Sequence, residues 1–463
     1  MSKTAVWEIL PRAVILLLLV GGAVFLWSCS TRKKEPGPVS TVIHPEWARN
    51  ANIYEVNVRQ FTPEGTFAAF EKHLPRLKEM GVDILWLMPI HPIGIKNRKG
   101  TLGSYYSVRD YLAVNPEFGT LEDLRNLVNQ VHELGMYVII DWVANHTAWD
   151  NPLIMEHPEW YTADSTGVIV PPVPDWTDVA DLDYSKPGLR DYMTRALVYW
   201  VQEAGIDGYR CDVAGMLPVD FWNKAVPEIK KIKPVFMLAE WETPEMHDSA
   251  FDMTYSWNLF HLMNSIARGE KTADQLDTLW AREALEYAPD AYRMRFTSNH
   301  DENSWNGTEY ERLGEAAKLF AVLTYTVPGM PMIYSGQEAG FNKRLRFFDK
   351  DTIEWDNYRL VSFYTSLNRL KKENPALWNG ESGGKLMKIP TGNDKKIYAF
   401  TRMKEKNQVL VILNLSPGLE AVRLEGHSFI GTYRNVFSGE IRRFEDISEF
   451  TMKPWEYLVF VKQ

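Results

Sequence analysis

Residues 137–146 have the sequence YVIIDWVANH, in which a run of apolar, strand-forming residues ends abruptly in polar ones. The same pattern returns in three later segments: GIDGYRCD (205–212), VFMLAE (235–240) and MRFTSNHD (294–301). A short apolar run bounded by polar or turn residues is typical of a buried strand in a parallel sheet. These four segments therefore predict parallel strands whose carboxyl ends meet at one edge.

Further runs of this kind alternate with amphipathic stretches, of which residues 67–80 and 121–134 have the helical period. The complete set of predicted strands covers residues 53–58, 84–88, 137–140, 206–211, 235–239, 251–255, 293–297 and 330–334. About eight such units predict a (β/α)8 TIM barrel, an α/β fold whose active sites lie at the carboxyl ends of the strands.

The chain has 463 residues, which is more than one typical domain. We expect the barrel to occupy residues 46–375. A loop region rich in Pro, Asp and Trp, residues 147–185, is predicted to be inserted after the third strand. Beyond the barrel the helical pattern stops and alternating strands follow, which predicts an antiparallel β-sandwich over residues 376–463.

The first 29 residues have the pattern of a signal peptide, because basic residues precede an apolar run at 13–27. This run is shorter than the roughly 20 residues of a spanning helix, and a short signal anchor is the alternative. The segment LWSC (26–29) resembles a bacterial lipobox in which Cys29 would carry the lipid, although Trp27 replaces the usual small residue.

Residues 30–45 are predicted to be a tether, since they are charged and contain Pro and Gly. We therefore expect an exported lipoprotein, anchored to a membrane through Cys29 and facing the periplasm or the cell exterior. The only other cysteine is Cys211, so no intrachain disulfide is expected in the mature protein.

The net charge of −9 is dispersed along the chain, which argues against a nucleic-acid partner. No segment indicates an obligate protein partner. The 17 tryptophans would suit stacking against sugar rings, although core packing accounts for most of them.

Two carboxylates at neighbouring strand ends suggest glycoside hydrolysis with retention, which needs one carboxyl group as nucleophile and another as acid and then base. Asp212 and Glu240 end adjacent predicted strands. Arg210 points to the same face as Asp212 and would keep it ionised, while a poorly solvated site beside Trp241 would keep Glu240 protonated. Asp301 would bind sugar hydroxyls.

The four strand-end segments resemble the four signature regions of the α-amylase family, glycoside hydrolase family 13. The resemblance extends over about residues 50–460, since GVDILWLMPIHP (81–92), GSYYSVRDYLAVNPEFGTLEDL (103–124) and GMPMIYSGQEAG (329–340) are similar to that family as well. It implies that Asp212 is the nucleophile, Glu240 the acid/base and Asp301 the transition-state stabiliser.

The resemblance also implies a set of substrate-binding residues. Tyr106 would stack under the sugar that is cleaved, and Trp241 is a further candidate platform for a sugar ring. Asp141 would brace the arginine rather than touch substrate. The remaining polar binding residues implied by the family are His146, Arg210 and His300.

Calcium is the one cofactor that the resemblance suggests, with Asn145 and Asp181 as candidate ligands. Two oxygen ligands fall short of the six to eight that calcium takes, so carbonyls and water would have to supply the rest. The alternative, that both side chains hydrogen-bond within the loop, has equal weight.

The expected activity is cleavage of α-1,4-glucosidic bonds in starch, maltodextrin or related α-glucans by double displacement. Gly215 and Met216 stand where many α-amylases have Lys-His, which leaves cyclodextrin or oligosaccharide hydrolysis open. Exo-acting α-glucosidase activity and glycosyl transfer on the same scaffold also remain open. A non-catalytic binding protein is disfavoured, because it has no physical need for three desolvated carboxylates.

Overall fold

The computed structural model describes residues 38–355 and 358–463. The predicted signal peptide, the predicted lipid site at Cys29 and residues 30–37 of the predicted tether lie outside the described residues. Among the helices that are described, none combines the length and the apolar character that a membrane crossing requires.

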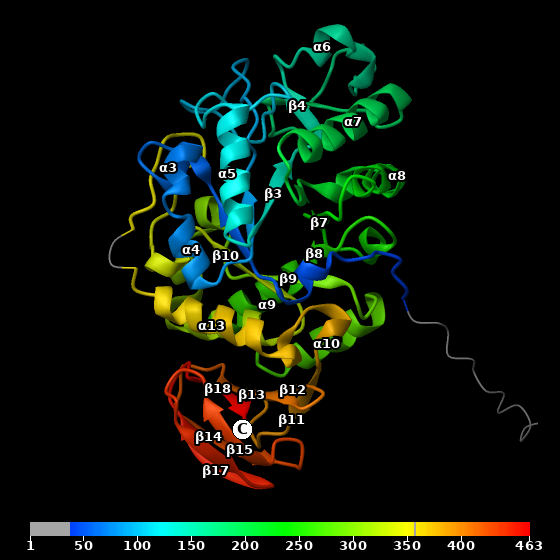
Figure 1. Ribbon diagram of the computed structural model, residues 1–463. Coiled ribbons are helices and arrows are strands. Elements are labelled where there is room, and N and C mark those ends of the chain that lie inside the picture. The colour runs from blue at the N-terminus through cyan, green and yellow to red at the C-terminus, as the bar shows by residue number, and fades with distance from the viewer. Residues whose placement is uncertain (1–37, 356–357) are drawn as a thin grey trace, which may run out of the picture. The chain divides into compact units, whose positions relative to one another are not determined.

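Eight parallel strands close into the predicted barrel (Figure 1). In order around the barrel they are β1 (Ile53–Val56), β2 (Ile84–Leu87), β3 (Tyr137–Trp142), β6 (Gly208–Cys211), β7 (Phe236–Ala239), β8 (Met253–Tyr255), β9 (Tyr292–Arg295) and β10 (Met330–Tyr334). The first strand is shorter than predicted, because Val58 already begins a short helix, α2 (Val58–Phe61).

Helices surround the barrel (Figure 1). The α-helices of five residues or more are α3 (Phe67–Glu71), α4 (Leu74–Met80), α5 (Leu121–Glu133), α7 (Pro187–Glu203), α8 (Val219–Lys230), α9 (Trp257–Ala267), α10 (Gln275–Glu286), α11 (Glu309–Leu313), α12 (Ala317–Thr326) and α13 (Val361–Glu373). The prediction of a single helix over residues 67–80 is wrong, because the structure has two helices there, α3 and α4. Pro75 lies in the first turn of α4, and inside one longer helix its ring would clash with the carbonyl of Glu71.

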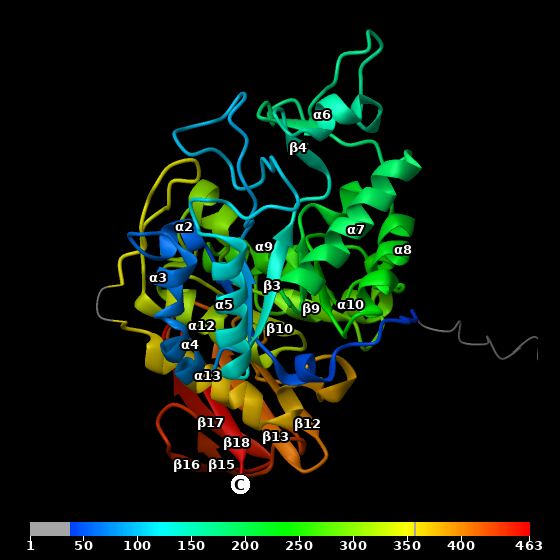
Figure 2. The ribbon, with the colours of Figure 1, turned by 45° about the horizontal axis from the view of Figure 1, so that its top comes forward.

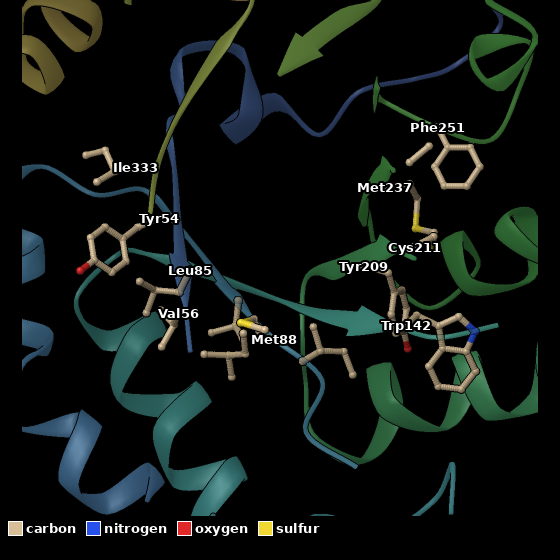
Figure 3. Packing of buried hydrophobic residues seen from close by; sticks show 14 of the residues in the cluster. Tyr54, Val56, Leu85, Met88, Trp142, Tyr209, Cys211, Met237, Phe251 and Ile333 are labelled. Carbon is tan, nitrogen blue, oxygen red and sulfur yellow. The ribbon is translucent and has the colours of Figure 1, made fainter. Parts of the chain in front are cut away.

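The strands bury both faces, which is why their sequences are almost continuously apolar. One set of side chains, including Trp86, Ile139, Phe236 and Leu238, fills the barrel interior. The alternate set, which includes Tyr209 and Cys211, packs outward against the helices (Figure 3). Cys211 is therefore a packing residue, as the strand alternation predicts.

The inserted region contains a short hairpin of β4 (His146–Ala148) and β5 (Val179–Asp181) and a short helix, α6 (Leu153–Glu156). In both ribbon views β4 and α6 lie at the end of the barrel away from the C-terminal strands (Figure 2).

The C-terminal strands form two antiparallel sheets, as predicted. Their strands are β11 (Lys385–Ile389), β12 (Ile397–Lys404), β13 (Asn407–Asn414), β14 (Glu420–Glu425), β15 (Gly431–Asn435), β16 (Ile441–Phe444), β17 (Ile447–Met452) and β18 (Tyr457–Lys462). Strands β14 and β17 form the smaller sheet, which shares one hydrophobic cluster with the larger one. Arg402 from β12 donates to the carbonyls of Val327 and Trp378, which ties these sheets to the barrel's last helices.

Candidate active site

The strand register brings the predicted catalytic residues to one edge of the barrel. Cys211 pairs with Ala239 across β6 and β7, so the next residues, Asp212 and Glu240, follow side by side. Gly208 makes this pairing possible, since a Cβ there would lie 1.9 Å from the carbonyl oxygen of Phe236. Only glycine fits such a close backbone approach.

Arg210 is the centre of the site and has no exposed surface. Its Nη1 lies 2.8 Å from Asp141 Oδ1 and 2.9 Å from Asp212 Oδ1. Its Nη2 forms an ion pair with Glu240 Oε1 at 2.8 Å, without hydrogen-bond geometry. One guanidinium therefore contacts two buried carboxylates and the partly exposed Glu240, and it orients both members of the predicted catalytic pair.

The two catalytic carboxyl groups differ in proton affinity. Burial raises the pKa of Asp212 to about 6, against the opposing effect of Arg210. Burial raises the pKa of Glu240 to about 7, again opposed by Arg210 and assisted by the charge of Asp212. As the pH rises, Asp212 is thus the group that ionises first, and between about pH 6 and 7 Glu240 is the group that more often keeps its proton, as a nucleophile and a general acid require.

A strained backbone residue follows Asp212. Val213 has a φ of 36°, in the left-handed region that a β-branched residue rarely adopts. Its N–H donates to Glu240 Oε2 at 2.8 Å. Strain of this kind costs on the order of 1–3 kcal/mol and persists where the surroundings fix it. Here the strained turn aims a backbone donor at the acid/base residue.

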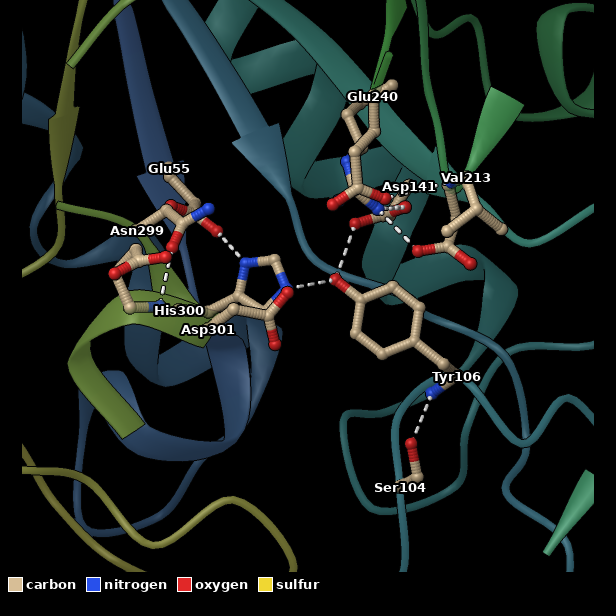
Figure 4. A network of polar contacts seen from close by, with 12 residues as sticks. Glu55, Ser104, Tyr106, Asp141, Val213, Glu240, Asn299, His300 and Asp301 are labelled. Carbon is tan, nitrogen blue, oxygen red and sulfur yellow. Dashed lines mark hydrogen bonds and ion pairs between the residues drawn. The ribbon is translucent and has the colours of Figure 1, made fainter. Parts of the chain in front are cut away.

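A hydrogen-bonded chain crosses the mouth of the barrel (Figure 4). The hydroxyl of Tyr106 lies 3.0 Å from Asp141 Oδ2, to which it can donate, and 2.7 Å from His300 Nε2. The same nitrogen is 3.3 Å from Asp301 Oδ2. Burial would raise the pKa of Asp301, but the adjacent His300 outweighs it and the pKa is lowered. Asp301 is therefore held as an anion, able to accept from sugar hydroxyls.

A cavity of about 600 Å³ opens over these groups, within the usual range of small-molecule sites. His146 lines it and is kept neutral, because burial lowers its pKa to about 4. The residues that line the cavity are Lys99, Ser104, Tyr106, His146, Asp175, Trp176, Asp178, Val179, Asp212, Val213, Glu240, Asp301, Trp305, Phe347 and Phe348. A second cavity, of about 630 Å³, lies between α7 and α8 and contains none of these residues.

Trp241 lies outside this lining. Its indole packs against Gly215, where a Cβ would be 2.1 Å from the ring. A direct contact of Trp241 with the sugar therefore remains a prediction, and its observed contact is with the turn that follows the nucleophile.

The two candidate calcium ligands come close together at the base of the β4–β5 hairpin, where His146 pairs with Asp181. The Asn145 amide lies 3.3 Å from the ring of His146. Within residues 38–355 and 358–463, no three His, Cys, Asp or Glu side chains are grouped so that they could hold a metal. The donor set thus falls short of a calcium cage, and calcium binding stays a prediction.

Several site residues were missed by reasoning from the sequence. Glu55 on β1 contacts His300, and Tyr255 on β8 accepts from Arg210 Nε at 3.3 Å. A charged residue inside the apolar run of β1 is a signal that could have identified Glu55. Lys99, Phe347 and Phe348 lie on loops and Trp305 lies in a short π-helix (Glu302–Asn306), where no periodic pattern marks them.

Comparison with known proteins agrees with this geometry. The family model described as the alpha-amylase catalytic domain matches residues 42–164 and 174–412, with a gap inside the inserted region. Alpha-amylase MalA of Haloarcula japonica is 28% identical over 423 residues, which cover 86% of this chain. The chain spans about 60% of the length of that relative.

Two solved structures are similar over almost their entire length. A noncanonic maltogenic alpha-amylase, AmyB from Thermotoga neapolitana, is 32% identical with a TM-score of 0.81, covering 89% of this chain and 98% of that one. An alpha-amylase from Lactobacillus plantarum is 33% identical with a TM-score of 0.81, covering 90% of this chain and 100% of that one. The chain therefore belongs to the α-amylase family of glycoside hydrolases.

Proposed function

We propose that the protein hydrolyses α-1,4-glucosidic bonds of starch, maltodextrins or related α-glucans, and that it retains the anomeric configuration. The observation that carries this proposal is the arrangement around Arg210. One buried guanidinium contacts Asp212 and Glu240, and the pKa of Asp212 lies below that of Glu240. Two adjacent carboxyl groups in opposite protonation states are what a retaining mechanism requires.

In the first half of the reaction, Asp212 attacks the anomeric carbon and forms a bond to it. The bond from that carbon to the glycosidic oxygen breaks, and Glu240 gives its proton to the departing oxygen. Positive charge develops on the sugar ring as this happens. The anion of Asp301 and the hydroxyl of Tyr106 would stabilise that charge and the distorted ring.

In the second half, Glu240 has become a carboxylate and acts as a base. It takes a proton from water, whose oxygen attacks the anomeric carbon while the bond to Asp212 breaks. Two inversions give net retention, and both carboxyl groups return to their starting states. The N–H of Val213 would hold Glu240 in place for both steps.

The surrounding loops support a preference for short glucans. Lys99, on the loop after β2, donates to the carbonyl of Asp175 at 2.8 Å and pairs with Asp178 at 3.0 Å, both in the inserted region. Thr101 on the same loop donates to Asp349 at 2.6 Å, on the loop after β10. Three loops are thus joined into one wall beside the cavity, which would leave room for few sugars on that side.

A product profile on starch, maltoheptaose, cyclodextrin and pullulan tests this proposal. We expect internal cuts that give maltose and maltotriose, with short maltooligosaccharides competing well against starch. Glucose as the sole early product, released from chain ends, would replace this activity with an exo-glucosidase. If longer glucans form in place of hydrolysis products, the protein is a glycosyl transferase. If no substrate is cleaved, the protein acts as a glucan-binding protein.

We also propose that the protein is exported and anchored through Cys29, which rests on the sequence of its first residues alone. A diacylated or triacylated cysteine would give the two or more chains that stable anchoring needs. Cys29→Ser should release the protein from the membrane fraction or block its processing. If a radioactive fatty acid supplied to the cells does not label the wild-type protein, the proposed lipid anchor is wrong.

A further inference from the structure

Glu55 is a buried carboxylate inside the barrel that the reaction steps above do not use. It lies on β1 with no exposed surface. Its Oε1 is 2.5 Å from Nδ1 of His300 (Figure 4), and its Oε2 has no hydrogen-bond partner among the described residues. A carboxylate in this position is costly unless it is paired with a positive charge.

The hydrogen bonds around His300 determine where its protons lie. The proton of the Tyr106 hydroxyl is donated to Asp141. With its own proton directed to Asp141, the Tyr106 oxygen, 2.7 Å from His300 Nε2, is placed to accept a proton from that nitrogen. On the other side of the ring, Nδ1 faces a carboxylate, which accepts hydrogen bonds when ionised. Both ring nitrogens then carry protons.

We propose that Glu55 is a positioning residue that keeps His300 as an imidazolium cation, held between Glu55 on one side and Tyr106 and Asp301 on the other. This inference rests on the proposed function. It adds a second cation to a site in which Arg210 is already shared among three carboxylates.

The groups that face His300 come from every neighbouring element. Glu55 belongs to β1, Trp86 on β2 packs edge-on at 6.0 Å, and Phe347 lies 6.4 Å away on the loop after β10. Tyr106 and Asp301 complete the set. Burial alone would lower the pKa of His300, but the charges of Asp301 and Glu55 raise it well above its ordinary value.

A permanent cation at this position has two consequences. It keeps Asp301 ionised, so that the site presents an anion to the developing charge on the sugar. It also gives Nε2 a charge-assisted hydrogen bond, which is roughly twice as strong as one from a neutral imidazole. A neutral His300 would carry a proton on only one of its two ring nitrogens.

The direct test is a titration of the wild type labelled with ¹⁵N-histidine, with the His300 signals assigned by comparison with His300→Gln. We expect both ring nitrogens of His300 to remain protonated well above the ordinary histidine pKa of about 6.5. A His300 that lacks a proton on either ring nitrogen at neutral pH would be a neutral imidazole and would overturn the proposal. This readout does not depend on glucan cleavage, so it fails or succeeds separately from the proposed function.

Glu55→Gln removes the charge and keeps the shape. The pKa of His300 should fall in this variant. The kcat/KM of Glu55→Gln, divided by that of the wild type, should then decrease about tenfold for each pH unit above the lowered pKa of His300. Below that pKa the ratio should approach one. A purely structural role would lower the ratio equally at all pH values, which would contradict the proposal.

Glu338→Gln is the matched control. Glu338 is another fully buried carboxylate, but it pairs with Tyr54 and Arg76 on the outer side of the barrel. This variant should lose stability without changing the titration of His300 or the shape of the pH profile. If Glu55→Gln does not fold, the wild-type titration alone decides.

Discussion

The indole of Trp241 lies so close to Gly215 that a Cβ on residue 215 would be 2.1 Å from the ring. Gly215 belongs to the turn that follows Asp212, the proposed nucleophile, and Trp241 directly follows Glu240, the proposed acid/base. The segments that carry these two carboxylates therefore pack against each other. The absence of a side chain at 215 is a condition of this packing.

Gly215→Ala should displace either the turn or the indole. Gly215 is not among the residues with a left-handed backbone, so alanine meets only the clash with Trp241. Because the same turn positions the Val213 donor to Glu240, a shift near 1 Å should lower kcat about 100-fold. Steady-state kinetics on maltoheptaose measure this loss.

Trp241→Ala provides the control for that substitution. Removing the ring creates space, so adding Gly215→Ala to Trp241→Ala should cost much less than it does in the wild type. Additive effects of the two changes on kcat would show that the residues do not interact.

The pH dependence of kcat/KM should be bell-shaped. Activity rises through about pH 6 as Asp212 ionises, and it falls above about pH 7 as Glu240 loses the proton that it donates. Because maltooligosaccharides carry no ionisable group, both limbs belong to the free enzyme, and the two carboxyl groups titrate as a coupled pair. A profile that stays flat across both values would contradict this assignment.

Lys99→Met should lengthen the products. The substitution keeps the side-chain length but removes the ammonium that joins the loop after β2 to Asp175 and Asp178. We expect a larger share of maltotetraose and longer products from starch, with little change in kcat on maltotriose. Lys96→Met is the control, since Lys96 is exposed and does not line the cavity. An unchanged product distribution would mean that this wall does not limit substrate length.

The two catalytic carboxylates should differ in their response to the leaving group. Glu240→Gln should lose about 10²–10⁴-fold on maltooligosaccharides, but little in the first step with a glycosyl fluoride, whose leaving group needs no proton. Asp212→Asn should be inactive on both, because it lacks the nucleophile. Equal recovery of the two variants on the fluoride would overturn the assigned roles.

The sequence allowed the barrel, and the meeting of Asp212, Glu240 and Asp301 at one cavity, to be predicted for one physical reason. Each of these residues follows a buried strand, and parallel strands bring their carboxyl ends together. Glu55 escaped prediction because it lies within such a strand, where the surrounding residues indicate core.

Other features depend on tertiary contacts that leave no local pattern. Lys99, Trp305 and Phe347 lie far apart in sequence, and only the folded chain brings them to one cavity. The contact between Gly215 and Trp241 likewise joins two strand ends. The break between α3 and α4 had a local signal in Pro75, which the helical period concealed.

The central claim, that Asp212 attacks the sugar and Glu240 acts as acid and then base, is tested most directly by the configuration of the first product. Proton NMR during the first minutes of maltoheptaose hydrolysis distinguishes the α from the β anomer before mutarotation mixes them. Double displacement predicts that the newly formed reducing ends appear as the α anomer. Initial release of the β anomer would show a single displacement and would contradict the account.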